Sequence, residues 1–157
     1  MKWIYNDGGR SLYYKAPHVK DCVCRAIAIA NDKDYKVVYN TLKIFNNGVS
    51  PRNGMYESVY SKLLKSWGWK CISCENKNIH LKEDELPDGI IICKIDRHLV
   101  AVKDKIVYDT WDCTKVRKGK NKGKADIVKV KKYWIKENVA WKNHYIKQFI
   151  FHSYTVQ

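Results

Sequence analysis

A ten-residue stretch, residues 21–30, constrains this chain more than any other part of it. It reads Asp-Cys-Val-Cys-Arg-Ala-Ile-Ala-Ile-Ala, and its alanine and isoleucine content predicts a buried helix. Asp21 is a favourable N-cap residue, so the helix is expected to begin at Cys22. The free amides and positive dipole end of a helix N-terminus favour thiolate over thiol and can donate to an oxyanion. Cys22 is therefore a candidate nucleophile, the alternative being a cysteine that packs at the edge of a core helix.

Composition indicates the class of protein to which this helix belongs. The chain has 157 residues, 45% of them hydrophobic and 13% aromatic, which is typical of a globular protein and predicts a single domain over 1–157. The N-terminal region has no apolar run of the signal-peptide kind, and no segment is apolar for long enough to span a membrane. We therefore expect a cytoplasmic protein, in the host cytoplasm if it is viral, with no membrane partner and with six free thiols.

Hydrophobic periodicity predicts an α+β fold in which helices come first and a sheet follows. Apolar residues spaced by three and four indicate a helix capped by Asp34 and another that includes residues 56–64 and ends at Gly68. Residues 1–20 contain the turn signal Asp7-Gly8-Gly9 and are expected to form an irregular arm. Short β-rich runs then predict strands at 69–72, 90–95, 98–102, 105–109, 127–133 and 149–156. Their close succession favours an antiparallel sheet.

Two residues of the predicted sheet can supply partners for a nucleophile. His98 begins one strand and Asp109 ends the next. If the turn between these strands centres on Asp104 and Lys105, His98 and Asp109 share a face and lie one diagonal step, roughly 7 to 8 Å, apart. An imidazole base oriented by a carboxylate is what a cysteine nucleophile requires. A one-residue change in the turn would place the two on opposite faces and would favour Asp112 as the third member.

Several short motifs occur in an order that resembles the papain-like cysteine peptidase superfamily, and within it the bacterial double-glycine leader peptidases and their relatives. The same motifs are similar, more narrowly, to those of a small family of uncharacterised bacterial and phage proteins. They are Asp7-Gly8-Gly9-Arg10, Asp21-Cys22-Val23, residues 25–30, Arg97-His98, Ala101-Val102 and Asp109-Thr110-Trp111-Asp112.

The resemblance implies a papain-like fold, with N-terminal helices packed on a C-terminal antiparallel sheet. It implies that Cys22 is the nucleophile, His98 the base and Asp109 the orienting carboxylate of an amide hydrolase. The substrate would be a protein or peptide, attacked through a thioester intermediate, and no cofactor or metal is expected. Papain-like enzymes usually place a glutamine before the nucleophile as an oxyanion donor, whereas the only glutamines here are Gln148 and Gln157. Asn6 or a backbone amide, such as that of Cys22, is expected to take that role.

Zinc binding is one alternative, because two cysteine pairs can supply thiolate ligands. The residues concerned are Cys22, Cys24, Cys71 and Cys74, with His80 nearby. The pairs are far apart in the sequence, and the spacing of the first pair is tight for an ordinary zinc ribbon.

Nucleic-acid binding is a second alternative, since the formal net charge is +14. Residues 114–125 form a basic, glycine-containing segment that we expect to be an exposed loop, with Tyr133, Trp134 and Trp141 nearby to stack on bases. Its basic residues are Lys115, Arg117, Lys118, Lys120, Lys122 and Lys124. The same segment could instead guide an acidic protein partner, and a non-catalytic descendant that antagonises a host protein would keep the fold without the activity.

Overall fold

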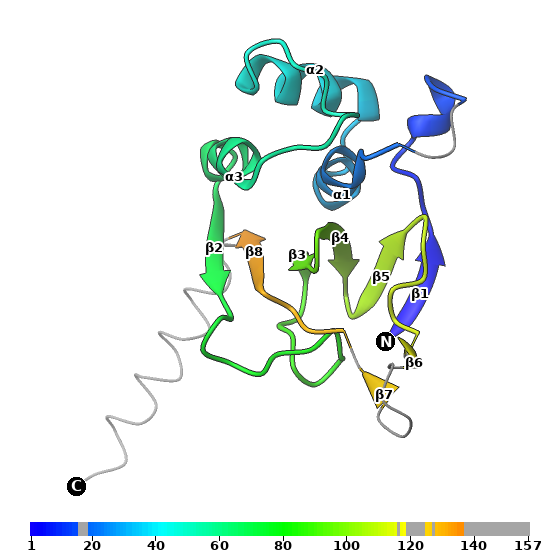
Figure 1. The fold of residues 1–157 in the computed structure, drawn as a ribbon, viewed down its shortest axis with the longest axis vertical. Coiled ribbons are helices and arrows are strands. Elements are labelled where there is room, and N and C mark those ends of the chain that lie inside the picture. The colour runs from blue at the N-terminus through cyan, green and yellow to red at the C-terminus, as the bar shows by residue number, and fades with distance from the viewer. Residues whose placement is uncertain (16–18, 116, 119–124, 127, 137–157) are drawn as a thin grey trace, which may run out of the picture.

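The computed structural model describes residues 1–15, 19–115, 117–118, 125–126 and 128–136. Within them, three α-helices lie on the same side of a six-stranded sheet, as Figure 1 shows. The helices are α1 (Cys22–Asn31), α2 (Tyr35–Phe45) and α3 (Glu57–Ser66), and a short 3-10 helix spans Arg10–Leu12. The strands of the sheet are β1 (Lys2–Tyr5), β2 (Trp69–Ser73), β3 (Ile90–Ile95), β4 (His98–Lys103), β5 (Ile106–Asp109) and β8 (Lys132–Lys136). The α+β prediction is confirmed.

The sheet is mixed, which corrects the prediction of a purely antiparallel one. Its order is β1-β5-β4-β3-β8-β2, and every pairing is antiparallel except that of β1 with β5. The first strand lies within the segment expected to be an irregular arm. Its four residues are too few to show a reliable alternation, and its partner is distant in the sequence. This strand and the residue after it hold the end of β5 in place, because the backbone oxygen of Asp109 accepts from the Trp3 indole and from the Asn6 amide, each at 3.1 Å.

The first two helices begin where the sequence predicts, but only one of them is capped as predicted. Asp34 caps α2 by accepting hydrogen bonds from the backbone amides of Lys36 at 2.8 Å and Val37 at 3.2 Å. Asp21 precedes α1 without capping it through its side chain. Its buried carboxylate instead accepts from the Tyr35 hydroxyl at 2.7 Å and pairs with Arg25. Tertiary partners with stronger donors therefore take the carboxylate that a local rule assigned to the helix end.

The sheet separates two hydrophobic clusters. On one face, α1 packs against β4 and β3, with α2 and α3 beside it, around residues such as Ile27, Leu63 and Trp134. On the other face, loop residues such as Leu81 and Leu86 cover the side chains that the strands direct away from the helices. Because α1 lies between α2 and the sheet, with α3 packed on β2 beside it, all but its first and last residues are buried. Its N-terminus reaches the surface at the end of the sheet where β4 begins.

The segment that follows β5 departs from the sequence prediction in its described part. Two short strands, β6 (Arg117–Lys118) and β7 (Ala125–Asp126), pair antiparallel where we expected an exposed loop. The strand predicted at 127–133 begins instead at Lys132 and continues to Lys136. Lys120, Lys122, Lys124, Trp141 and the strand predicted at 149–156 lie outside the described residues. In the part of the chain that the structure describes, no helix has the length and apolar character needed to cross a membrane.

Candidate active site

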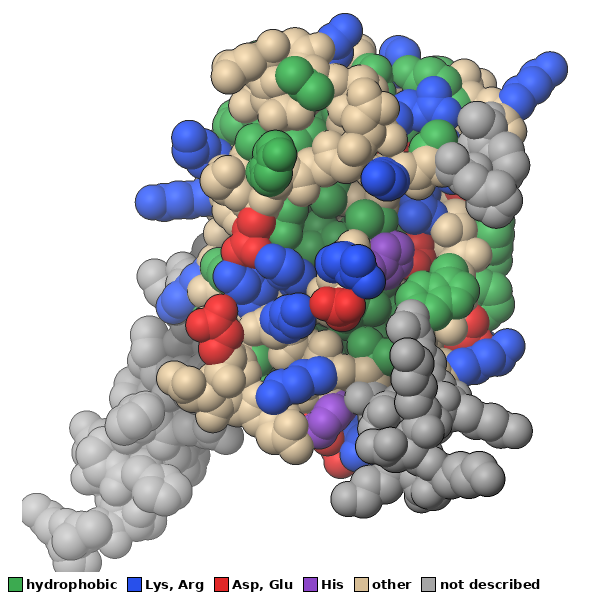
Figure 2. Space-filling view, viewed as in Figure 1, with side chains coloured by type: hydrophobic (Ala, Val, Ile, Leu, Met, Phe, Trp, Pro, Cys, Tyr) green, Lys and Arg blue, Asp and Glu red, His purple; other side chains and the backbone are tan. Residues whose placement is uncertain are grey.

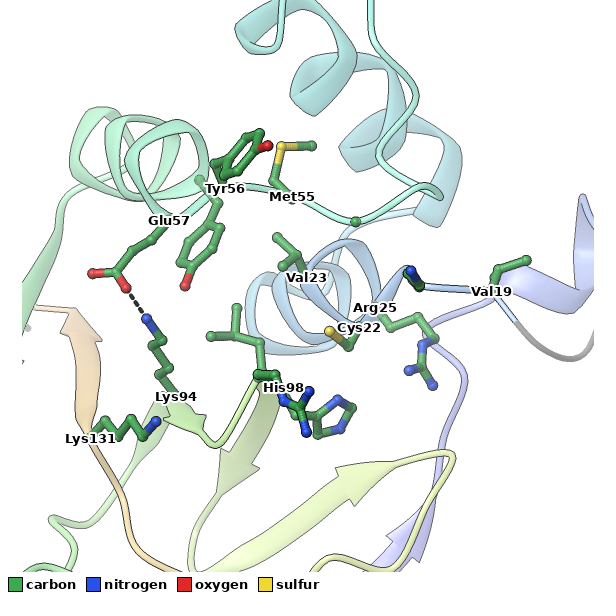
Figure 3. Close-up of a pocket in the computed structure, with 15 residues that line it drawn as sticks. Val19, Cys22, Val23, Arg25, Met55, Tyr56, Glu57, Lys94, His98 and Lys131 are labelled. Carbon is green, nitrogen blue, oxygen red and sulfur yellow. Dashed lines mark hydrogen bonds and ion pairs between the residues drawn. The ribbon is translucent and has the colours of Figure 1, made fainter.

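Cys22 is the first residue of α1 and lies in the wall of a cavity of about 780 Å³. Figure 3 shows the cavity bounded by the start of α1, the start of α3 and the hairpin that joins β3 to β4. Its apolar lining comes from Val19, Val23, Met55, Tyr56, Tyr60 and Leu99. Only partly exposed, the Cys22 thiol is thus accessible from a space large enough for several amino-acid side chains.

The β4–β5 hairpin places His98 beside Asp109, as its register predicts. Asp104 and Lys105, at φ values of 47° and 64°, form the two-residue turn of the left-handed kind that suits a hairpin. Val102 lies opposite Val107, and this pairing brings both functional residues to one face. His98 Nε2 lies 2.5 Å from Asp109 Oδ2, which leaves Nδ1 as the ring nitrogen for the thiol.

Asp112, the alternative third member, has different partners. Its Oδ1 atom accepts from the Thr114 backbone amide at 3.1 Å and from the Thr114 hydroxyl at 2.6 Å, and Oδ2 pairs with Lys115. The structure therefore joins His98 to Asp109 and assigns Asp112 to a local turn.

The electrostatics around Cys22 favour an ion pair. Burial raises the pKa of the Cys22 thiol, but the hydrogen bond and charge of His98, aided by the Leu99 amide and Arg25, outweigh it and leave the pKa lowered. Burial also disfavours charge on His98, yet hydrogen bonds to Asp109 and Cys22 raise its pKa to about 9. Both shifts favour thiolate with imidazolium near neutral pH, which is the reactive form of a cysteine nucleophile.

Cys24 shows what the same helix does to a thiol without these partners. It is fully buried, and its Sγ atom lies 3.7 Å from the backbone oxygen of Tyr35. Burial raises the pKa of the Cys24 thiol to about 12. Of the two cysteines at the start of α1, only Cys22 combines access with activation.

Arg25 is a part of the site to which the sequence patterns assigned no role. Its guanidinium lies 3.0 Å from Asp21 Oδ1 and 3.2 Å from Asp109 Oδ1, and it donates to the Thr110 hydroxyl. The Arg25 side chain is only 6% exposed, and both carboxylates are buried. Arg25 thus holds one oxygen of Asp109 and leaves the other for His98.

A sequence signal for this role did exist. Arg25 is the one charged residue inside an otherwise apolar helix, three positions after Cys22 and four after Asp21. A buried guanidinium requires a carboxylate partner, because leaving it unpaired costs several kcal/mol, roughly 3 to 5. A lone arginine in an apolar helix predicts that acidic side chains lie next to it in the fold, but it does not predict that one of them is Asp109.

Gly8 allows the N-terminal loop to approach α1 closely at Arg25. It has φ +66°, and a Cβ atom there would lie 3.1 Å from the Arg25 backbone oxygen. The Gly8 amide donates to Asn6 Oδ1 at 2.8 Å. The carboxamide oxygen of Asn6 is therefore engaged in this turn, and Asn6 is not among the described residues that line the cavity. A role for Asn6 or for the Cys22 amide at an oxyanion stays a prediction.

Trp111 packs against the imidazole of His98. The two rings meet edge to face, with centroids 5.9 Å apart, and 42% of Trp111 is exposed. Because the indole stands between the ring and bulk water on that side, it reduces the competition of water for the hydrogen bond between His98 and Asp109.

The cysteines of the zinc alternative are not brought together. Cys24 belongs to the core on the helix side of the sheet, Cys74 to the cluster on the other face, and Cys71 is exposed. His80 pairs with Glu85 at 2.9 Å. Within the described residues, no three or more His, Cys, Asp or Glu side chains form a group that could hold a metal ion.

Lys115, in the basic segment, does not line the cavity; it is exposed and pairs with Asp112 at 3.5 Å. The backbone of Arg117 and Lys118 forms β6. The cations that do line the cavity come from elsewhere in the chain, namely Lys20, Arg25, Lys94, Arg97 and Lys131.

Comparisons with models of protein families, with curated proteins and with solved structures give no significant match for this chain. The chemistry of the cavity is therefore the basis on which a function can be assigned.

Proposed function

We propose that the protein is a cysteine peptidase, or a related amide hydrolase, with a papain-like fold. The observation that carries the proposal is the placement of Cys22, at the start of α1, and of His98, which is bonded to Asp109, in the wall of the same cavity. The lowered pKa of the Cys22 thiol, to which His98 contributes, agrees with this placement. A helix that presents the thiol and a sheet that presents the base and carboxylate support the papain-like assignment. The buried Arg25 adds a fixed support for the carboxylate.

The reaction follows from these positions. The Cys22 thiolate attacks the carbonyl carbon of the scissile amide, and a backbone amide at the start of α1 stabilises the oxyanion. His98 then gives its proton to the leaving nitrogen, the C–N bond breaks and a thioester remains on Cys22. In the second half, His98 takes a proton from water, the hydroxide adds to the thioester, and the acid leaves as the thiolate is restored. Asp109 keeps the imidazole oriented and stabilises its protonated form throughout.

Thiol alkylation tests the proposal directly. Iodoacetamide at pH 6.5 is expected to modify Cys22 about 10 to 100 times faster than any other thiol, because only the thiolate reacts. Mass spectrometry of peptides from the native protein measures the rate at each of the six cysteines. Equal rates at Cys22 and the exposed Cys71 would contradict an activated nucleophile.

Hydrolysis is tested with a mixture of unstructured peptides and with matched variants. Cys22→Ala is expected to abolish release of new amino termini, and Cys24→Ala, two residues along the same helix, is expected to retain it. Loss of activity in both variants with intact folding would argue against Cys22 as the nucleophile.

A further inference from the structure

The cavity carries an excess of positive charge in a defined arrangement. Glu57, at the start of α3, accepts from Lys94 and from Lys132, the latter at 2.5 Å. Asp96, in the β3–β4 hairpin, pairs with Lys131 at 3.0 Å and with Arg97 at 3.6 Å. Each carboxylate is thus shared by two cations, so each group keeps one positive charge without a counter-charge of its own.

These charges lie on one side of the reactive pair. Figure 3 shows Glu57, Lys94 and Lys131 to one side of Cys22 and His98, with Val19 and Arg25 on the other side. The charge of Arg25 is already balanced by the buried carboxylates of Asp21 and Asp109. In Figure 2, Lys and Arg side chains gather in the middle of this face with acidic side chains between them, next to a histidine and a hydrophobic hollow. Among the cations labelled in Figure 3, those that lack a full counter-charge, Lys94 and Lys131, therefore lie in one direction from the thiol, and Lys20 is a further exposed cation of the lining.

The cations of the two groups differ in exposure. The side chains of Lys94 and Lys132 are only 26% and 20% exposed, so their charges are less screened than those of a solvated lysine. Lys131 and Arg97, at 51% and 92% exposed, are more strongly screened and act mainly at low salt. The nearby walls are apolar, formed by Val23, Met55 and Leu99. The surface beside the thiol therefore suits a segment that combines an apolar side chain with an anionic one.

We propose that the cavity selects polypeptide segments carrying an acidic side chain close to the scissile bond, on the side where Lys94, Arg97 and Lys131 lie. The substrate carboxylate would join the two cation groups as a third acceptor, and an apolar side chain next to it would occupy the hollow beside Val23 and Leu99. This proposal rests on the proposed function and names the class of substrate for the same site.

The arrangement favours a peptide over a nucleic acid. A phosphate backbone carries closely spaced negative charges, and Glu57 and Asp96 stand among the cations that would have to receive them. A single carboxylate side chain needs only one uncompensated cation at a time. The apolar walls add contacts that a phosphate chain cannot use.

Two small thiol reagents separate charge from reactivity. Iodoacetate is anionic and iodoacetamide is neutral, but both are attacked by the same thiolate. The ratio of the iodoacetate rate to the iodoacetamide rate at Cys22 therefore cancels any change in the ionisation of the thiol. The double variant Arg97→Glu/Lys131→Glu is expected to lower this ratio by about 10-fold at low salt, and less at high salt. Lys2→Glu, at an exposed residue of β1 outside the cavity, is the control for a charge reversal remote from the thiol and is expected to leave the ratio within about twofold.

Peptide pairs then test the substrate class. Peptides that are cleaved are resynthesised with Glu or Gln at each position flanking the cut, and kcat/KM is measured for both members. We expect about a 10-fold preference for Glu on one side of the cut, lost in the double variant and kept in Lys2→Glu.

The outcomes distinguish failure of this proposal from failure of the proposed function. Selective alkylation of Cys22 with equal cleavage of Glu and Gln peptides would overturn the acidic preference and leave the hydrolase intact. A slow, unselective Cys22 would overturn both. Protection of Cys22 by a single-stranded oligonucleotide, lost in the double variant, with no effect of acidic peptides, would also overturn the proposal and assign the cations to nucleic acid.

Discussion

The two faces of the sheet bury thiols in opposite electrostatic surroundings. On the helix side, Cys22 has an imidazole and a guanidinium for neighbours, and its pKa is lowered although burial opposes this. On the other face, Cys93 is fully buried among apolar side chains and near two further cysteines, and burial raises its pKa far above the ordinary value. Burial alone therefore makes a thiol inert, and activation depends on the few charged groups that enter one core and not the other.

That contrast has a structural cost on the helix side. Arg25, Asp21 and Asp109 are charged groups inside a packed core, and Arg25 pairs with both carboxylates. The apolar cluster behind the sheet has no such dependence. Substitutions on the two sides of the sheet should consequently differ in how much they lower the free energy of unfolding and in whether they change the reactivity of Cys22.

The largest effect is expected from Arg25→Met, which leaves Asp21 and Asp109 buried without their shared cation. We expect a loss of about 3 to 5 kcal/mol in the free energy of unfolding. Urea titration measures it, and Arg97→Met, whose native side chain is 92% exposed, is the matched control with an expected loss below about 0.5 kcal/mol.

Arg25→Lys separates positioning from bulk stability. Lysine keeps the positive charge but lacks the forked guanidinium group that contacts both Asp21 and Asp109. If Arg25 positions Asp109, the pH profile of Cys22 alkylation shifts to higher pH even in the folded Lys variant. If the Arg25→Lys variant is destabilised but the pH profile of Cys22 alkylation is unchanged, the role of Arg25 is purely structural.

The second effect concerns His98→Ala, which should make Cys22 resemble the thiols behind the sheet. Without the hydrogen bond and charge of the imidazole, burial dominates and the pKa of the Cys22 thiol rises. Alkylation at pH 6.5 is expected to slow by at least about 10-fold, because a smaller fraction of the thiol is then ionised at that pH. The rate constant is measured across pH 5 to 10, and a profile that coincides with that of wild type would contradict the ion pair.

The third effect is a pH dependence of stability that appears only when the thiol is removed. The pKa of His98 is raised from 6.5 to about 9, so its contribution is complete below 6.5 and is lost as the pH rises toward 9. The pKa of Cys22 is lowered from 9.0, so its contribution has the opposite slope in the same range. In wild type the two slopes oppose each other.

Cys22→Ser removes one of these slopes. Its unfolding free energy is expected to fall by about 1 to 2 kcal/mol as the pH rises above 6.5, because Asp109 still raises the pKa of His98 although the contribution of Cys22 is gone. The fall in wild type is expected to be smaller. Chemical denaturation at several pH values measures both curves. Asp109→Asn in the Cys22→Ser background should flatten the curve again, and a persistent slope would assign it to another group.

The smallest effect is expected behind the sheet. Cys93→Ala removes one buried sulfur and should cost about 1 to 2 kcal/mol through lost packing, with no change in the alkylation rate of Cys22. Thermal unfolding and the labelling assay measure the two quantities. A change in Cys22 reactivity would show that the two faces are coupled through β3 and β4.

Sequence patterns predicted the local parts of this structure well. The start of α1, the Asp34 cap and the β4–β5 turn depend on neighbouring residues, and the turn alone fixed the register that joins His98 to Asp109. What they missed depends on distant partners. The pairing of β1 with β5, the diversion of Asp21 from its helix end and the contact of Arg25 with Asp109 arise only when the chain is folded.

Because the residues that activate Cys22 lie far from it in the sequence, the reactivity of Cys22 reports on folding. Formed alone, α1 offers the thiol only a helix end, whereas His98 arrives with strands that must first pair and then dock on that helix. Alkylation in short pulses at mildly acidic pH during refolding would thus record the moment of docking and not of helix formation. A nascent or misassembled chain would carry an ordinary thiol, and reactivity would be acquired together with the completed core.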